Sequence, residues 1–448
     1  MRFKKDQAAS PGFTIIELLI VVVVIAILAA ITIVAYNGIT KKAVDTSLKS
    51  DLQNTATKLE VTTEQSGSGS YPDTQQEVDV AQSKNNIVSY TKKAYGYCIS
   101  ASNPQASTSY AFRSNTKTIE EGNCDVNVSN FAGTGTSGFA DGAGAQAQFT
   151  QPAGIVSGSD GSVYVSSNNR IRKITTDGTV STLAGSGTSG NANGSATSAQ
   201  FTQPGKISLD KTDTLYVSDV TSHTVRKVDT ATGTVSAFTG TPASCNYGRG
   251  SLIDGTATTA RHDRPSSVTV NSAGIFYITE AGSQRVREAL PDGSLTTYAG
   301  SGTLNACTAS SAQAGSANGA RLSAMFAGMS DIIADKNDTL YITDSGNNIV
   351  RTISSNGIVA NYGSMINLPK AITIDSQGTL YVASSHAIYT ITSTGLTTIF
   401  AGSTSAGYVN GVGTAARFNN ISDITLSADQ TAMFVADSTN NRIRKISL

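Results

Sequence analysis

A single carboxylate inside an apolar run is the first feature of this sequence that could do chemistry. Glu17 lies near the start of a stretch that runs from Phe13 to about Tyr36 and is otherwise almost entirely apolar. A charge inside a membrane segment costs about 2.5–3.5 kcal/mol on insertion scales, so a carboxylate kept there indicates a function or a partner. Residues 13–36 are long enough to span a bilayer. The basic leader before them predicts that the remainder of the chain is exported.

The other candidate groups are three histidines and two repeated sets of charged side chains. His262 and His386 are isolated from any ligand motif, and His223 lies in a turn where a structural role is favoured. Acids recur at strand ends, where they either form an electronegative ring or cap the following turns, and capping is favoured: Asp219, Glu280, Asp344 and Asp437. Arginines recur on a later strand, where they are expected to brace neighbouring repeats or face solvent: Arg172, Arg226, Arg287, Arg351 and Arg444. No catalytic residue, metal or cofactor is predicted.

Composition excludes some classes of function. The 448 residues carry no net charge and only 14% charged side chains, so nucleic acid is not expected as a partner, because phosphate binding needs concentrated positive charge. The 42 glycines, with many Ser and Thr, indicate turn-rich β structure. Export favours oxidised cysteines, and none of the four forms a CxxC motif. We predict two disulfides, Cys98–Cys124 and Cys245–Cys307.

The N-terminal part of the chain is predicted to be a long helix with a small α+β head. Apolar residues continue at helical spacing through residues 37–65, and the Gly-Ser-Gly-Ser segment after them ends the helix. The second half of the helix is expected to pack on a small sheet with strands over 87–100 and 107–120. This predicts a leader over residues 1–12 and a first domain over 13–124.

From Phe131 onward a second pattern recurs six times. Each copy has four short β runs separated by turn dipeptides, which is typical of a blade in a β-propeller. The fifth copy is the shortest and most divergent, with Ile388-Tyr389 where the others have an apolar residue and Arg. The last copy lacks a fourth strand, and residues 125–132 align with it. We therefore predict an all-β, six-bladed propeller over 125–448, closed by pairing of 125–132 with 441–448.

Two family resemblances follow from these residues. The segment Gly12-Phe13-Thr-Ile-Ile-Glu17 resembles the leader and helix of type IV pilins and pseudopilins, with Pro11 as a departure. The resemblance implies that a prepilin peptidase cuts between Gly12 and Phe13, that Phe13 is N-methylated, and that Glu17 aligns subunits in a fibre with other pilins. The Phe-x-x-Pro, Leu-Tyr-Ile-Thr-Asp and Ile-Arg-Lys-Ile runs resemble NHL-repeat β-propellers, which include binding modules and some lactonases and lyases.

The expected function is display of a propeller at the cell surface. A single-pass anchor at 13–36 would hold the propeller outside the cell, where it would bind an extracellular protein or glycan and act in adhesion. The alternatives are a membrane-tethered propeller enzyme of lactonase or lyase type and a pseudopilin of a secretion system. The longest connections, 240–264 and 301–325, crowd one face and are candidate binding loops. The candidate binding residues in them are Tyr247, Arg249 and Arg261.

Overall fold

This computed structural model describes three parts of the chain. They are residues 40–64; residues 80–121 except 81, 84, 94–95, 105–108 and 114–117; and residues 126–448 except 243, 246–248, 251, 302–313 and 377. The chain divides into two compact units, 1–124 and 125–448. Within the described residues no helix is long and apolar enough to cross a membrane, and the predicted span over 13–36 lies outside them.

The first unit contains a helix over residues 40–64 and one antiparallel sheet. Its strands pair in sequence order: β1 (Ile87–Lys93), β2 (Gly96–Ser102), β3 (Ser109–Arg113) and β4 (Thr118–Glu121). The predicted strand over 87–100 is thus the pair β1 and β2, and the predicted strand over 107–120 is the pair β3 and β4, because the chain reverses direction within each range. The helix packs on the sheet as predicted, and its buried stripe is Leu48, Leu52, Ala56 and Leu59.

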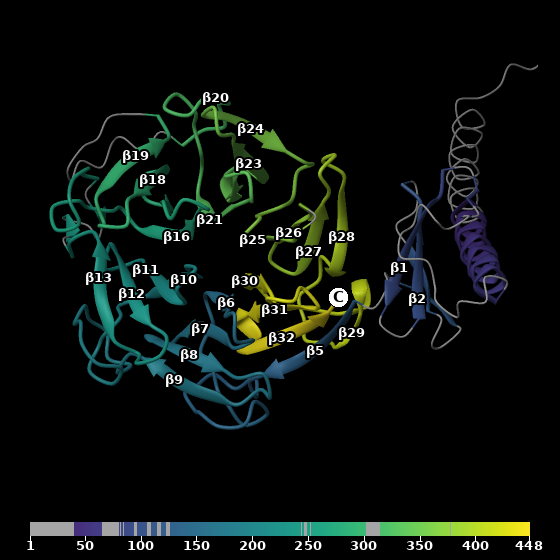
Figure 1. The fold of residues 1–448 in the computed structure, drawn as a ribbon, viewed down its shortest axis with the longest axis horizontal. Helices are drawn as coiled ribbons and strands as arrows, with labels where there is room; N and C mark the ends of the chain where they lie inside the picture. Colours follow the sequence, from purple (N-terminus) through teal and green to yellow (C-terminus); the bar gives the residue numbers. More distant parts are fainter. Residues whose placement is uncertain are drawn as a thin grey trace, which may run out of the picture. The chain divides into compact units, whose positions relative to one another are not determined.

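Six antiparallel sheets, the blades, surround a common axis in the second unit (Figure 1). Blade 1 is β6 (Ile155–Ser157), β7 (Val163–Ser167), β8 (Arg170–Ile174) and β9 (Val180–Ala184). Blade 2 is β10 (Pro204–Leu209), β11 (Thr214–Asp219), β12 (Thr224–Asp229) and β13 (Val235–Thr239). Blade 3 is β16 (Pro265–Val270), β17 (Phe276–Glu280), β18 (Arg285–Ala289) and β19 (Leu295–Ala299). Blade 4 is β21 (Met329–Ala334), β22 (Leu340–Asp344), β23 (Ile349–Ile353) and β24 (Ile358–Tyr362).

The last two blades complete the ring. Blade 5 is β25 (Ala371–Ile374), β26 (Leu380–Ala383), β27 (Ala387–Ile391) and β28 (Thr397–Gly402). Blade 6 is β30 (Ile421–Leu426), β31 (Ala432–Asp437), β32 (Arg442–Ser447) and β5 (Asn127–Ala132). Short elements lie between the blades: β14 (Ser244–Cys245), β15 (Arg249–Gly250), β20 (Gly319–Ala320), β29 (Gly411–Val412) and η3 (Gly413–Ala415). Two more, η2 (Ser345–Asn347) and η4 (Ser438–Asn440), connect the second and third strands of blades 4 and 6. The strand nearest the axis is β6, β10, β16, β21, β25 and β30 in blades 1 to 6, respectively (Figure 1).

Ring closure follows the predicted pairing. Strand β5, from the start of the second unit, pairs antiparallel with β32 at the C-terminus, with Val128 opposite Ile446 and Ala132 opposite Ile443. The other edge of β5 pairs with β29. Closure therefore leaves neither end of the ring with an open strand edge, which is how propellers avoid edge-to-edge aggregation.

In five blades the connection leading into the blade also covers the outer strand. A glycine in that connection pairs with the outer strand of the following blade, and we call this extended segment the strap. In blade 1, Gly142 N donates to Val180 O (2.9 Å) and Val180 N donates to Gly142 O (2.8 Å). The strap glycines are Gly142, Gly194, Gly255, Gly319 and Gly411.

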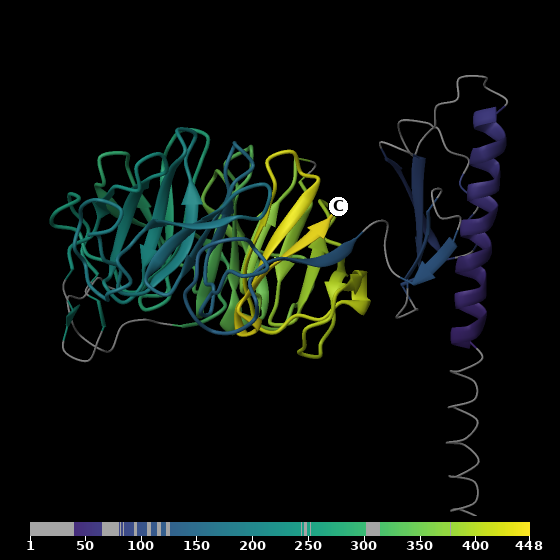
Figure 2. The same ribbon diagram turned by 90° about the horizontal axis from the view of Figure 1, so that it is seen from below.

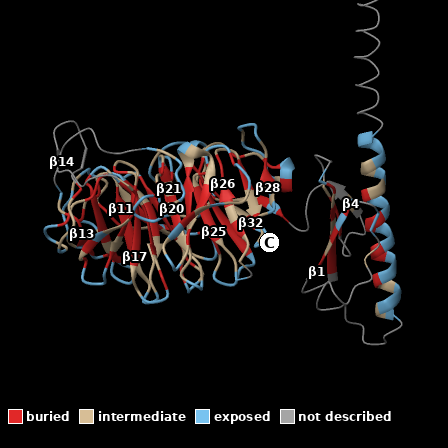
Figure 3. Cartoon of the chain, turned by 90° about the horizontal axis from the view of Figure 1, so that it is seen from above, coloured by how far each residue is buried: buried red, intermediate tan, exposed pale blue. Residues whose placement is uncertain are grey.

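The core lies between successive blades. A phenylalanine that begins the Phe-x-x-Pro run is fully buried against the preceding blade: Phe201, for example, packs with Ile171 of blade 1 and Leu215 of blade 2. Buried residues concentrate in the strands, and exposed residues in the connections at the two faces (Figure 3). Figure 2 shows the ring edge-on, with the strands running between these faces. The phenylalanine thus fastens blades 1, 2, 4 and 6 to the preceding blade, and buried His262 and Ile366 take its position in blades 3 and 5.

Candidate functional site

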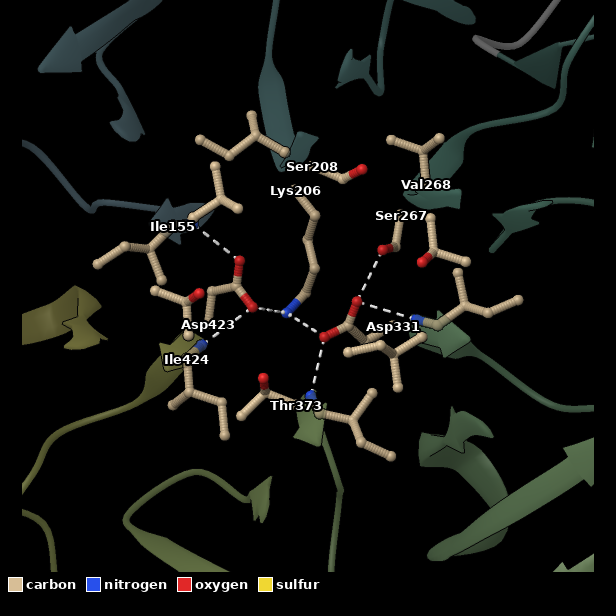
Figure 4. Close-up of a pocket in the computed structure, with 16 residues that line it drawn as sticks. Ile155, Lys206, Ser208, Ser267, Val268, Asp331, Thr373, Asp423 and Ile424 are labelled. Carbon is tan, nitrogen blue, oxygen red and sulfur yellow. Dashed lines mark hydrogen bonds and ion pairs between the residues drawn. The ribbon is translucent and has the colours of Figure 1, made fainter. Parts of the chain in front are cut away.

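The innermost strands bring one repeat position to the axis of the ring. This position lies two residues after the proline of Phe-x-x-Pro or the residue that replaces this proline. The six residues are Gly154, Lys206, Ser267, Asp331, Ala371 and Asp423. Blades 2, 4 and 6 therefore carry charged side chains at this position, which Figure 4 shows meeting at the axis. Blades 1, 3 and 5 carry the small uncharged residues Gly154, Ser267 and Ala371.

The three charged residues form one buried cluster, the axial trio. The Lys206 ammonium donates to Asp423 Oδ1 (2.6 Å) and to Asp331 Oδ2 (3.0 Å). Its third hydrogen bond goes to the Ser422 carbonyl oxygen (2.9 Å). All three side chains are at least nine-tenths buried. An ammonium has three donors, so Lys206 is fully satisfied.

The other three blades also bond to the trio. The Ile155 amide of blade 1 donates to Asp423 Oδ2 (2.8 Å). The Ser267 hydroxyl of blade 3 donates to Asp331 Oδ1 (2.7 Å), and the Ile372 amide of blade 5 donates to Asp331 Oδ2 (2.9 Å). Figure 4 shows these bonds converging from all sides of the axis. Every blade is thus tied to the centre by at least one hydrogen bond to the trio.

The environment shifts the pKa of two members of the trio. Burial raises the pKa of Asp423 to about 7; the Lys206 ammonium opposes this rise and the Asp331 carboxylate adds to it. Burial alone would lower the pKa of Lys206, but the two carboxylates outweigh it and the pKa is raised. The ammonium is therefore charged at neutral pH.

A small cavity of about 100 Å³ adjoins the trio. It is lined by isoleucine and valine side chains and by hydroxyl-bearing residues of several inner strands, among them Ser208, Thr269 and Thr373. This volume corresponds to about three water molecules at ~30 Å³ each. Among the residues that the structure describes, no group of three or more His, Cys, Asp or Glu side chains is arranged to hold a metal ion.

A second cavity, of about 330 Å³, lies beside turns that connect strands within blade 6 and within blade 1. Asp160, Asp429 and Lys445 line it together with Phe131 and Phe434. Its size lies at the lower end of the range of small-molecule sites.

The trio was not recognised in the sequence, although a signal for it exists. Aligning the six copies on Phe-x-x-Pro places Lys206, Asp331 and Asp423 at the same repeat position. Charged side chains are rare at fully buried positions unless they are paired. An inner-strand position occupied by one lysine and two aspartates therefore predicts an ion cluster at the axis.

The repeated arginines are buried, so the expectation that they face solvent is wrong. Each of them clasps the connection that leads into its own blade. In blade 4, Arg351 Nη1 donates to Met325 O (3.0 Å) and Nη2 donates to Ala317 O (3.0 Å) and Asn318 Oδ1 (2.6 Å). Equivalent bonds are made by Arg172, Arg226, Arg287 and Arg444. The arginine thereby holds the strap against the blade.

The strand-end acids do not form an exposed ring. Three of them accept a hydrogen bond from a side chain of the following turn: Glu280 from Ser283, Asp344 from Asn347 and Asp437 from Asn440. Asp344 accepts from Arg351 Nη1 (2.9 Å) and from the Ala327 amide (2.8 Å), and Asp437 accepts from Arg444 Nη1 (3.0 Å). The turns after Asp344 and Asp437 have no side-chain cap on their backbone N–H groups. All four acids are fully buried. They connect the second strand, the arginine and the preceding connection, which is a structural role.

The histidines also make structural contacts. His223 lies in the turn between the second and third strands with φ +60°, as Asn169, Asn348 and Asn441 do in other blades. Its Nδ1 accepts from the Arg264 amide (3.1 Å). His262 Nδ1 lies 2.8 Å from Glu280 Oε1, and burial lowers the pKa of His262 in spite of this carboxylate. The Nδ1 of His386 accepts from the Asn420 amide (3.2 Å).

The candidate loop residues are only partly described. Arg261 is half-buried, and its carbonyl oxygen accepts from Arg287 Nη1 (3.2 Å). Tyr247 lies outside the described residues, and of Arg249 only the backbone, in β15, is described. Cys98 is disulfide-bonded, but its predicted partner Cys124 lies outside the described residues.

The remaining sequence predictions stay untested. The side chain of Cys245 and the whole of Cys307 are not described, so their pairing stays a prediction. Gly12, Phe13 and Glu17 lie in the part of the chain that precedes the described residues.

The fold defines a β-propeller that follows a smaller N-terminal unit in the chain, and two family models match parts of this chain. Residues 122–354, just over half of the 448 residues, match the Teneurin NHL domain, and the chain belongs to this family. Residues 9–33 match the prokaryotic N-terminal methylation motif. Both resemblances drawn from the sequence are confirmed by these matches.

Individual relatives are distant. The chain is 32% identical over 95 residues to Protein SUPPRESSOR OF QUENCHING 1, chloroplastic, from Arabidopsis thaliana, and spans only 9% of that protein's length. A structural genomics protein of unknown function from Bacteroides thetaiotaomicron has 15% identity and a TM-score of 0.54, over 82% of this chain and 91% of that one. An auxiliary nutrient binding protein from the same organism has 14% identity and a TM-score of 0.53, over 80% and 84%. At these identities the structural likeness establishes the fold alone.

Proposed function

We propose that this chain is a pilin-like surface subunit whose propeller binds an extracellular protein or glycan and so serves in adhesion. The observation that carries the proposal is the position of β5. This strand follows the N-terminal unit directly in the chain and is also the outer strand of blade 6. It is hydrogen-bonded to β32 on one edge and to β29 on the other. A pull on the anchor is therefore borne by a strand that is held on both edges, as a displayed binding head requires.

The chemistry of the axis supports binding over metal-assisted hydrolysis. The two carboxylates that converge at the centre, Asp331 and Asp423, are already bonded to Lys206 and to backbone amides. Their charge is used to hold the blades together. The remaining partners of the proposal are the prepilin peptidase, other pilin subunits and the membrane through residues 13–36. The methylation motif at residues 9–33 implies processing by the prepilin peptidase, and the other two partners are proposed together with it.

The test compares attachment of cells of the native host that carry three forms of the gene. One strain lacks the chain, one carries the full-length chain, and one carries a chain that ends at Cys124. Surface labelling first establishes that the full-length and shortened chains are displayed in equal amounts. The proposal expects attachment to host or partner cells to be restored by the full-length chain alone. Equal attachment by cells that display the shortened chain would show that the propeller is not the adhesive part.

The second candidate is a membrane-tethered enzyme of lactonase or lyase type, and the cavity of about 330 Å³ beside Asp160, Asp429 and Lys445 is the observation that favours it. Purified full-length protein would be assayed for bound metals by elemental analysis and for lactone hydrolysis. Metal bound in stoichiometric amount, with turnover that Asp429→Asn abolishes, would replace adhesion with catalysis as the function. A pseudopilin role predicts instead that loss of the chain blocks secretion and leaves attachment unchanged.

A further inference from the structure

Blade 5 is the exception among the blades, because it has no strap. The connection between β24 and β25 is short, and the sheet of blade 5 ends at β28. Within the described parts of the chain no segment pairs with the outer edge of β28, whereas the outer strand of every other blade pairs with a strap glycine. The arginine that clasps the strap is also missing, and Tyr389 stands in its place.

The register identifies which backbone groups of β28 are left open. Thr397 is opposite Ile391, as Val180 is opposite Ile174 in blade 1. Val180 exchanges both of its backbone hydrogen bonds with the strap. Strand alternation then makes Thr397 and Ile399 the residues whose N–H and C=O groups point outward from blade 5.

The side chains around this edge are apolar or uncharged. Leu396 is 50% exposed, Ile399 is 38% exposed and Met365, in the short connection, is 71% exposed. The connection runs beside β28, since the Ser364 amide donates to Thr397 Oγ1 (2.9 Å). Residues 387–416 contain no charged residue, histidine or proline. Exposed strand edges are often protected against pairing by charged side chains or proline, and this edge has neither.

We propose that β28 pairs antiparallel with β28 of a second copy of this chain, so that two fifth blades form one continuous sheet. A two-fold interface brings the same patch of both copies together, and an uncharged patch meets itself without like-charge repulsion. The strand also complements itself. If the two-fold axis passes through Thr398, Thr397 of each copy lies opposite Ile399 of the other copy. The outward-pointing N–H and C=O groups of these four residues then form hydrogen bonds across the interface. This interface is additional to the proposed adhesive function and does not depend on it.

Cysteine cross-linking of the full-length chain in membranes tests the pairing. Thr398 would face its own counterpart at a non-hydrogen-bonded position, where Cα atoms are ~4.5 Å apart, within the range of ~4.4–6.8 Å that a disulfide spans. Mild oxidation of Thr398→Cys is expected to give a reducible dimer. Ser181→Cys is the matched control, because Ser181 is exposed at the equivalent position of β9 but the strap covers that edge. Equal cross-linking of the two variants, or none in Thr398→Cys, would overturn the proposal.

A second variant separates β pairing from chance collision. In the Thr398→Cys background, Ile399→Lys puts two lysines at diagonal positions ~7–8 Å apart across the pair and removes an apolar contact. The side chain is partly exposed, so the fold should tolerate the change, and an unchanged melting temperature checks this. Dimer yield is expected to fall at least several-fold. An undiminished yield from the folded variant would show that the copies meet without the β28 pairing.

Discussion

Replacing Lys206 by methionine tests whether the axial trio stabilises the propeller. Methionine keeps much of the length of the side chain but removes the ammonium, which leaves Asp331 and Asp423 buried without their counter-ion. Breaking a buried ion pair by removing one partner costs about 3–5 kcal/mol. Unfolding entropy is about 2.1 cal/mol/K per residue, or about 0.7 kcal/mol/K for a unit the size of residues 125–448. The melting temperature is therefore expected to fall by about 4–7 °C.

The assay is thermal unfolding of the detergent-solubilised full-length chain, followed by circular dichroism. Lys370→Met is the matched control, because Lys370 is a half-buried lysine whose hydrogen-bond partner is the neutral Asn420 side chain. Its loss is expected to cost about 1 kcal/mol, which is typical of one hydrogen bond. The triple variant Lys206→Met, Asp331→Asn, Asp423→Asn should recover most of the loss, because it leaves no charge at the axis. Equal losses in Lys206→Met and Lys370→Met, or no loss at all, would refute the structural role of the trio.

Three further predictions concern titration, disulfides and loops. The raised pKa of Asp423, about 7 against 3.8 for the unfolded group, means that the folded chain holds this proton more tightly. The stability that this bound proton contributes is fully present below pH 3.8 and is lost as pH rises through about 7. The melting temperature of the wild type should therefore fall between about pH 5 and pH 7.5, and Asp423→Asn should make this fall smaller. Parallel curves for the two proteins would contradict this. Non-reduced peptide mapping should find two disulfides, Cys98–Cys124 and Cys245–Cys307, and free thiols at 245 and 307 would rule out the second. Trimming 243–258 and 304–316 should weaken attachment of a displayed, folded chain, and undiminished attachment would move the ligand site elsewhere.

The ring closure could be predicted from sequence because it depends on a local pattern. Residues 125–132 carry the same alternation and Ala-Gly ending as the outer strand of blade 1, so their partner could be inferred from the strand that the last copy lacks. The helix over 40–64 was predictable for a similar reason, since its apolar residues recur at helical spacing. Periodicity conveys which face of an element is buried, and this was sufficient at both places.

The sequence offered bracing of neighbouring blades or exposure to solvent for the arginines, but it did not predict their burial or the axial trio, because both depend on contacts between distant parts of the chain. An arginine on a strand is ordinarily taken as a surface residue. Arg351 is buried because carbonyl oxygens of the connection before its blade satisfy its guanidinium. The trio joins Lys206 to residues more than a hundred positions away, Asp331 and Asp423, which only the closed ring brings together.

The N-terminus and exposure of the mature protein test the central claim most directly. Intact cells of the native host would be labelled with a membrane-impermeant reagent, and the labelled full-length protein would be purified and analysed by mass spectrometry. Display by a pilin-like anchor predicts label on lysines of the propeller, residues 125–448, and a mature chain that begins at Phe13 with an added methyl group. A chain that still begins at Met1 in cells with an active prepilin peptidase, or a propeller that takes up no label, would contradict the account.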